Sequence, residues 1–347
     1  MERIRRIGIL LGLGAALALV AASCGDDGGA TGSPDEGASL TVYSGREEEF
    51  VASLFEQFET DTGVQVDVRY GDSAELAATL VEEGDSSPAD VFFSQDAGSL
   101  GAVAEAGLFA EIDPETLNRV EERFRSPEGL WVGTSGRGRV AVYNTEVLDP
   151  SDLPTSILDL TDARWEGRVG LPPTNSSFQA HVAAMTLTIG EGPTRDWLEG
   201  LMANGVRFYE DNGATTRAVA AGEIELGLVN HYYKFEVEAE DGSLPIANHF
   251  FESGDPGSFV NTSGVGILDS AENADAAGRF IDYLTGDAGQ SWVGTETWEY
   301  PVAPGYEPSV DLLALSRFVG PEGQVDLSDL GPALPGALRL LADVGMV

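Results

Sequence analysis

The sequence predicts an α/β fold of two lobes, with a ligand cleft between them. Between residues 40 and 106, three β-prone runs alternate with three helical patterns. This order is typical of a parallel sheet covered by helices. A second alternating series begins after residue 143, and the length of 347 residues leaves room for roughly two domains.

The composition excludes several classes of protein. The chain carries 58 Asp and Glu against 19 Lys and Arg, a net charge of −39, and 42% of its residues are hydrophobic. That hydrophobic share supports a large buried core rather than a disordered acidic chain. Because so acidic a surface repels phosphate groups, we expect neither nucleic acid nor an anionic membrane surface as a binding partner.

The N-terminal segment indicates export. A basic start over residues 1–6 precedes an uncharged apolar run over residues 7–22, the pattern of a secretory signal peptide. Cys24, the only cysteine, occupies the position at which bacterial lipoprotein signals carry the lipidated residue. We expect a signal peptide over 1–23, then lipidated Cys24 and a flexible linker over 24–39. The mature protein would be an extracytoplasmic lipoprotein anchored to the cell membrane, without disulfides.

The first series follows from its apolar periodicity. Residues 40–43 form a β-prone run, Phe50, Leu54 and Phe58 then recur at helical spacing, and Gly63 ends that helix. The same reasoning predicts strands at 64–70 and 91–93 and helices at 73–83 and 97–106. Because ligands bind at the carboxyl ends of parallel strands, the loops after the first and third strands are expected at the site.

The second series follows a long strand at 139–143. It is expected to contain strands at 168–171, 206–209, 226–229 and 264–268, and helices at 177–189, 194–202, 214–221 and 274–284. The segments 138–143 and 262–268 are expected to cross between the lobes. Lobe 1 would then comprise 40–138 with about 264–312, and lobe 2 would comprise 139–263 with about 313–347. The interlobe cleft is the expected ligand site.

Two adjacent tyrosines are the sharpest chemical feature. Tyr232 and Tyr233 follow a predicted strand, directly after Asn230 and His231. A phenol has a pKa of about 10, but a strongly Lewis-acidic metal displaces its proton and binds the phenolate. Such hard oxygen ligands suit a hard metal ion. The alternative is that both tyrosines are ordinary core or rim residues.

Six segments resemble the ferric-ion-binding solute receptors of bacterial ABC importers. They are Leu40–Gly45, Ser87–Phe92, Thr134–Arg137, Gly167–Thr174, Ala221–Ile224 and Asn230–Tyr233. The resemblance implies a type II periplasmic-binding-protein-like fold, with two parallel or mixed sheets, helices on both faces and a central cleft. It also implies a monomeric receptor, not an enzyme, that binds Fe³⁺ in the cleft and delivers it to the membrane subunits of an ABC importer.

The resemblance also implies the metal ligands. The family's adjacent tyrosine ligands correspond to Tyr232 and Tyr233. Its first-loop ligand, commonly His, falls on Glu47, with Glu48 as a close alternative. A fourth family position, often Glu, falls on Gln95, which is neutral. Two phenolates and the Glu47 carboxylate would balance the charge of Fe³⁺.

A synergistic anion is implied as well, carbonate or a phosphate-like ion. The family's anion pocket corresponds to Asn175, Ser176, Ser177, Asn212 and Asn230. Hydroxyls, amides and a helix N-terminus suit such an anion. Asp96 replaces a neutral amide there and would repel the anion, whereas Arg137 would supply compensating charge. The alternative for Arg137 and Arg139 is a salt bridge at the end of a strand.

Other functions stay open at this point. Because Glu47 and Gln95 depart from the family's ligands, a receptor of the same fold could bind a small organic or anionic solute, with the tyrosines stacking on it. An enzyme is disfavoured, because no nucleophile, base and orienting group can be assembled. His181 is expected to be structural. His231 either contacts the metal ligands and so affects the metal site, or packs in the core.

Overall fold

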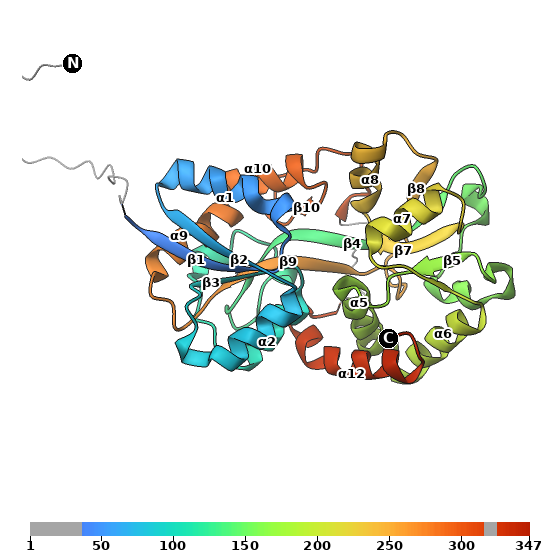
Figure 1. Cartoon of the computed structure of the whole chain (residues 1–347), viewed down its shortest axis with the longest axis horizontal. Coiled ribbons are helices and arrows are strands. Elements are labelled where there is room, and N and C mark those ends of the chain that lie inside the picture. Colours follow the sequence, from blue (N-terminus) through green and yellow to red (C-terminus); the bar gives the residue numbers. More distant parts are fainter. Residues whose placement is uncertain (1–36, 316–324) are drawn as a thin grey trace, which may run out of the picture. The chain divides into compact units, whose positions relative to one another are not determined.

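The computed structural model describes residues 37–315 and 325–347 (Figure 1). The predicted signal peptide, the lipidation of Cys24 and most of the linker therefore lie outside the described residues. Within the described ranges, no helix is both long enough and apolar enough to cross a membrane.

Three βα units build the first half of the sheet. They are β1 (Ser39–Ser44), α1 (Glu48–Thr62), β2 (Gln65–Tyr70), α2 (Ser73–Glu83), β3 (Val91–Ser94) and α3 (Ala97–Glu105). β1 lies between β2 and β3 and runs parallel to both, as the sequence predicted. α1 buries Val51, Leu54, Phe55 and Phe58, and it ends at Gly63 with a left-handed φ of 76°.

The strand β4 (Val132–Asn144) joins this half to a second one (Figure 1). Up to Gly138 it pairs antiparallel with β9 (Val260–Ile267) and, at two residues, with β10 (Tyr300–Pro301). From Arg139 onward it pairs with β7 (Leu226–Asn230) and β8 (Ile246–His249). β9 pairs on its other side with β3, so all of its pairing is with the first half.

The second half surrounds β7. Its further elements are β5 (Val169–Leu171), α5 (Ser176–Ile189), α6 (Glu191–Ala203), β6 (Arg207–Phe208), α7 (Asn212–Ala220) and α8 (Tyr233–Asp241). β5 pairs parallel with β6 and β7. Alternate residues of β4 face two clusters, Ala141 and Tyr143 the main core, Val140 and Val142 a smaller one. Both faces of this sheet are therefore covered, as in α/β proteins generally.

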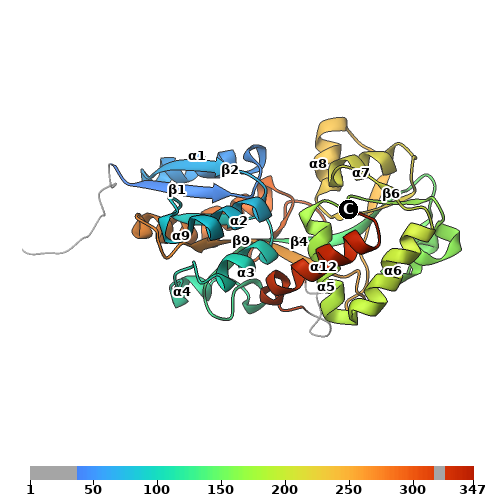
Figure 2. The ribbon, with the colours of Figure 1, turned by 60° about the horizontal axis from the view of Figure 1, so that its bottom comes forward.

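The remaining helices return along the molecule. They are α4 (Pro114–Leu117), α9 (Ala274–Thr285), α10 (Asp287–Glu296) and α12 (Leu330–Asp343). α9 belongs to the first half, where Phe280 stacks on Phe55 at a centroid distance of 5.6 Å. α12 packs against both α3 and α5, so it touches one helix of each half (Figure 2).

Candidate functional site

Tyr232 and Tyr233 lie at the junction of β7 and α8. β7 ends at Asn230, and Tyr232 is the N-cap of α8. Both side chains are buried, with exposed fractions of 3% and 7%. Their rings stack with centroids 4.4 Å apart, and each phenol acts on the pKa of the other. The two phenols therefore lie side by side at the start of α8.

The electrostatic surroundings keep both phenols protonated in the absence of a cation. Burial raises the pKa of Tyr232, and Arg137 and Arg46 act against this rise. Burial also raises the pKa of Tyr233, and the adjacent Tyr232 and the charges of Glu236 and Glu47 raise it further. Deprotonation here requires a strongly Lewis-acidic partner for the oxygens.

The loop after β1 approaches the tyrosines from the first half. Glu47, the N-cap of α1, has an exposed side chain whose charge acts on Tyr233. Burial raises the pKa of Glu47, and so do the charge of Glu49 and a hydrogen bond with it. One turn into α1, Phe50 packs edge-to-face on Tyr232 with centroids 6.4 Å apart. The structure thus brings the predicted first-loop position and the tyrosine pair together.

The two other first-half positions, Glu48 and Gln95, interact with residues other than the tyrosine pair. Glu48 is exposed, and its charge acts on Tyr70, whose pKa it helps to raise. Gln95 is half-buried, and its backbone N–H donates to the hydroxyl of Ser73 at 2.9 Å. Of the three candidates on these loops, Glu47 is the one whose charge acts on Tyr233.

Arg137, on β4, is buried without a hydrogen-bond partner. Its exposed fraction is 1%, and none of its three guanidinium nitrogens meets an acceptor among the described residues. Asn261 is its register partner on β9, and the side-chain nitrogen of Asn261 also has no acceptor there. Buried donors are normally satisfied, so these two side chains are unusual among the buried polar groups of β4 and β9.

Three of the six predicted anion residues, Asn212, Asn230 and Ser177, gather around Arg139. Its Nη1 donates to the side-chain oxygens of Asn230 at 3.0 Å and Asn212 at 3.3 Å. The side-chain nitrogen of Asn230 donates to the Ser177 hydroxyl at 3.1 Å. Burial, together with the charge of Arg137, lowers the pKa of Arg139 to about 9. The predicted alternative of a strand-end salt bridge is wrong for both arginines within the described residues.

Two other members of the predicted pocket cap helices. The side-chain oxygen of Asn175 accepts from the backbone N–H of Ser177 at 3.1 Å and begins α5, whose first residue is the half-buried Ser176. Asp96 accepts from the backbone N–H and the hydroxyl of Ser99, each at 2.9 Å, and begins α3. The carboxylate of Asp96, which the sequence analysis placed in the anion pocket, thus has a capping role.

The sequence analysis missed several charged residues beside the tyrosines. Arg46 and Glu299 form a buried ion pair of 2.9 Å. Glu236, one turn after Tyr232 on α8, has one carboxylate oxygen that is buried without a partner. Burial and the charges of Glu240 and Glu47 raise the pKa of Glu236 to about 8. A signal existed only for Arg46, which directly precedes Glu47 in the chain.

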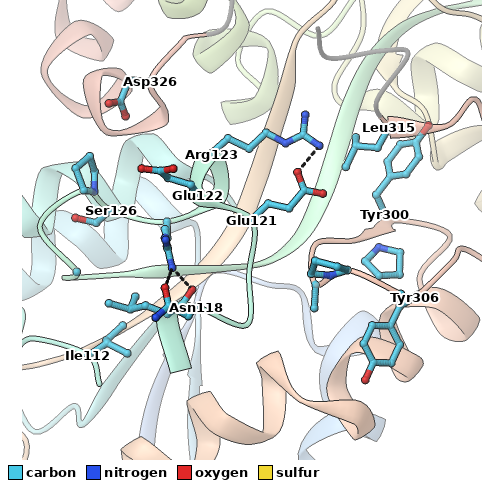
Figure 3. A pocket seen from close by; sticks show the side chains of 18 of the residues that line it. Ile112, Asn118, Glu121, Glu122, Arg123, Ser126, Tyr300, Tyr306, Leu315 and Asp326 are labelled. Carbon is cyan, nitrogen blue, oxygen red and sulfur yellow. Dashed lines mark hydrogen bonds and ion pairs between the residues drawn. The ribbon is translucent and has the colours of Figure 1, made fainter. Parts of the chain in front are cut away.

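A separate cavity of about 1270 Å³ contains none of the predicted site residues. It is lined by parts of residues 111–129 and 300–315, together with Val325 and Asp326. Figure 3 shows Arg123 beside Glu121 on its wall, with a contact of 2.9 Å. In the described ranges, no group of three or more His, Cys, Asp or Glu side chains could hold a metal.

The sequence is similar to a family of bacterial solute-binding proteins and to known iron-binding proteins. A family model described as bacterial extracellular solute-binding protein matches residues 86–320. The Fe(3+)-binding periplasmic protein of Serratia marcescens is 35% identical over 323 residues, covering 92% of this chain and 94% of the relative.

Two solved structures are similar over nearly their whole length. Iron-bound HitA from Pseudomonas aeruginosa superposes with a TM-score of 0.84 at 35% identity, covering 89% of this chain and 99% of that one. The FutA protein of Trichodesmium, in complex with iron and citrate ligands, gives a TM-score of 0.75 at 30% identity, with the same coverage.

Proposed function

This chain belongs to the bacterial extracellular solute-binding proteins, and we propose that it is a receptor that binds ferric iron and delivers it to an ABC importer. Its fold is the two-lobed, periplasmic-binding-protein-like α/β fold that the sequence predicted. The relatives named above are iron-binding proteins, and a role in transport rather than catalysis agrees with them. Export and anchoring through Cys24, and action as a monomer, are part of the same proposal.

The proposed metal ligands are Tyr232, Tyr233 and Glu47. The observation that carries the proposal is the pair of buried, stacked phenols within the electrostatic reach of Glu47. Phenolate and carboxylate oxygens are hard ligands, as Fe³⁺ prefers. Two phenolates and one carboxylate carry three negative charges, which balance the ion, so the ion itself supplies the free energy that deprotonates the phenols.

The proposed anion site lies beside these ligands. Arg137 would supply the charge and Asn212 a free amide N–H, because neither group has an acceptor among the described residues. Asn230 and Ser177 would shape the pocket through Arg139. Asn175 and Ser176 would contribute the N-terminus of α5. The occupant would be carbonate or a phosphate-like anion, or a carboxylate such as the citrate found with iron in the Trichodesmium relative.

Binding would couple to closure of the cleft. Glu47 belongs to the first half and the tyrosines belong to the second, so an ion bound by all three joins the halves. The ion favours the closed state only by the contacts that it gains there. We propose the earlier lobe division for this motion, with residues 138–143 as the crossing segment. The change of partners along β4 after Gly138 supports it.

Equilibrium dialysis of the metal-free protein against ferric citrate tests this function. We expect one ferric ion per chain, and Tyr232→Phe and Tyr233→Phe should each weaken binding at least tenfold, since each removes a charged ligand. Tyr306→Phe is the control, because Tyr306 lies on the wall of the separate cavity. Unchanged binding in both site variants would contradict the proposal.

An anionic organic solute is the second candidate. The unpaired guanidinium of Arg137 beside two stacked phenol rings suits a carboxylate or phosphate ester as well as a synergistic anion. A thermal shift caused by such solutes in the complete absence of iron, and larger than the shift that iron causes, would favour this candidate.

A further inference from the structure

We propose that Glu299 is a positioning residue for the iron site, which holds the loop of Glu47 with its side chain and the tyrosine segment through its turn. The inference rests on the proposed function. Glu299 follows α10 and precedes β10, and it is 1% exposed. Nothing in the roles assigned above uses it, although a carboxylate is costly to bury.

The contact to the first loop is an ion pair. The Oε1 atom of Glu299 accepts from Nη1 of Arg46 at 2.9 Å, and Arg46 is 4% exposed. Arg46 directly precedes Glu47. The hydroxyl of Ser44 also donates to the backbone carbonyl of Arg46 at 2.9 Å. The residue before the proposed ligand is therefore fixed both at its backbone and at its guanidinium group.

The other carboxylate oxygen binds β4, the strand that joins the two halves. Oε2 of Glu299 accepts from the hydroxyl of Ser135 on β4 at 2.5 Å. The Ser135 hydroxyl in turn lies 2.6 Å from that of Ser263 on β9. With both oxygens engaged, Glu299 has one orientation, and it transmits the position of β4 and β9 to the first loop.

The same turn contacts the tyrosine segment. The carbonyl of Trp298 lies 3.0 Å from Nε2 of His231. The backbone N–H of Gly138 donates to Nδ1 of that ring at 3.1 Å. Because Nδ1 accepts, Nε2 carries the proton and donates to Trp298. His231 directly precedes Tyr232, so both ring nitrogens serve to place the tyrosines and neither is free for a metal.

The backbone of Trp298, in the turn before Glu299, has an unfavourable conformation. Trp298 has a φ of 54°, and among the described residues no other residue except glycine has a positive φ. A large side chain in the left-handed region is unfavourable and persists only where its surroundings fix it. Here the peptide must direct the Trp298 carbonyl to His231 and the next side chain to Arg46.

The test compares Glu299→Gln with Glu296→Gln, an exposed glutamate on α10. Each purified protein is titrated with ferric citrate while the iron–phenolate absorption is recorded. We expect Glu299→Gln to weaken binding about tenfold and to shift the absorption maximum, while Glu296→Gln matches the wild type. In a Glu47→Gln background, Glu299→Gln should weaken binding less than about twofold further, because the ligand that it positions is already absent.

The results distinguish a failure of the positioning role of Glu299 from a failure of iron binding. If the two effects multiply without coupling, or if Glu299→Gln behaves like the control, the positioning role is wrong while iron binding stands. If the wild type neither binds iron nor develops the absorption, the function itself fails. Should Glu299→Gln not fold, the paired variant Arg46→Gln with Glu299→Gln removes both charges of the ion pair together, and the same coupling to Glu47 is expected.

Discussion

At the scale of single residues, the site is marked by buried donors that lack acceptors. A buried guanidinium without a counter-charge normally costs several kcal/mol relative to a paired one. The guanidinium of Arg137 has no hydrogen-bond acceptor among the described residues. The charges of Glu299 and Asp96 act on it, and so does the like charge of Arg139. An anion bound as proposed would supply the acceptor that Arg137 lacks and would stabilise the loaded state.

Replacing Arg137 is expected to affect stability and anion dependence differently. Arg137→Gln should leave the metal-free protein as stable as the wild type or more stable, because it removes an unpaired buried charge. It should also abolish the dependence of iron affinity on added bicarbonate or citrate. Chemical denaturation and iron titrations at varied anion concentration measure the two effects, with the exposed Arg207→Gln as control. A large loss of stability without iron would contradict the assignment.

A second residue-scale prediction concerns acid. Burial and the charge of Arg139 lower the pKa of His181 to about 3. The folded state therefore holds this imidazole neutral, and stability is lost as pH falls below about 6.5, the value in an unfolded chain. The loss should reach about 2 kcal/mol at pH 5. His181→Leu should flatten the fall in unfolding free energy between pH 6.5 and 5, and an unchanged slope would contradict the pKa shift.

Only part of this chemistry is visible in the sequence. Tyr232 and Tyr233 are adjacent, and adjacency at a strand end identified them. Arg46 and Glu299 are 253 positions apart, so nothing local connects them. Arg139 was considered only as a salt bridge, because its partners Asn212 and Asn230 are neutral and come together only through β4, α7 and β7.

At the scale of elements, the spacing of apolar residues predicted helices correctly where one face of the helix is mostly apolar. α1 and α9 each bury regularly spaced apolar residues, and both lie where the sequence placed them. α8 was not predicted as a helix, because its only buried residues are Tyr233 and Val237 among many charges. β8 was missed as well, since three of its four residues are only partly buried.

The contact of α12 with α3 gives an element-scale prediction. A Cβ atom on Gly331 would lie 2.8 Å from the backbone carbonyl carbon of Gly101, whereas one on Gly336 of the same helix would meet nothing closer than 3.8 Å. Gly331→Ala should therefore lower the melting temperature by forcing α12 away from α3. Gly336→Ala should raise it slightly, through helix propensity worth about 0.5–1 kcal/mol. Equal shifts in both variants would contradict the close packing.

At the scale of the whole molecule, charge governs stability. With a net charge of −39, the folded chain repels itself, and added salt screens this repulsion. We expect the unfolding free energy of the metal-free protein to rise between about 0.02 and 0.5 M NaCl. Chemical denaturation at fixed pH measures it, and a decrease over that range would show that specific ion pairs outweigh the overall repulsion.

The link between the two halves was predicted only in part. The sequence predicted two crossing segments, 138–143 and 262–268. The first lies on β4, which pairs with strands of both halves, whereas the second lies on β9, which pairs within the first half. The sequence did not indicate that α12 would pack against a helix of each half. No helix was predicted at residues 330–343, and the buried face of α12 is known from the structure alone.

The central claim is that one ferric ion binds to the phenolates of Tyr232 and Tyr233. The most direct test is the visible spectrum of the metal-free protein during titration with ferric citrate, with resonance Raman excitation in any band that forms. We predict a phenolate-to-iron band that saturates at one ion per chain, carries phenolate vibrations, and weakens in Tyr232→Phe and in Tyr233→Phe. Tight iron binding by the folded protein without such a band would contradict the claim.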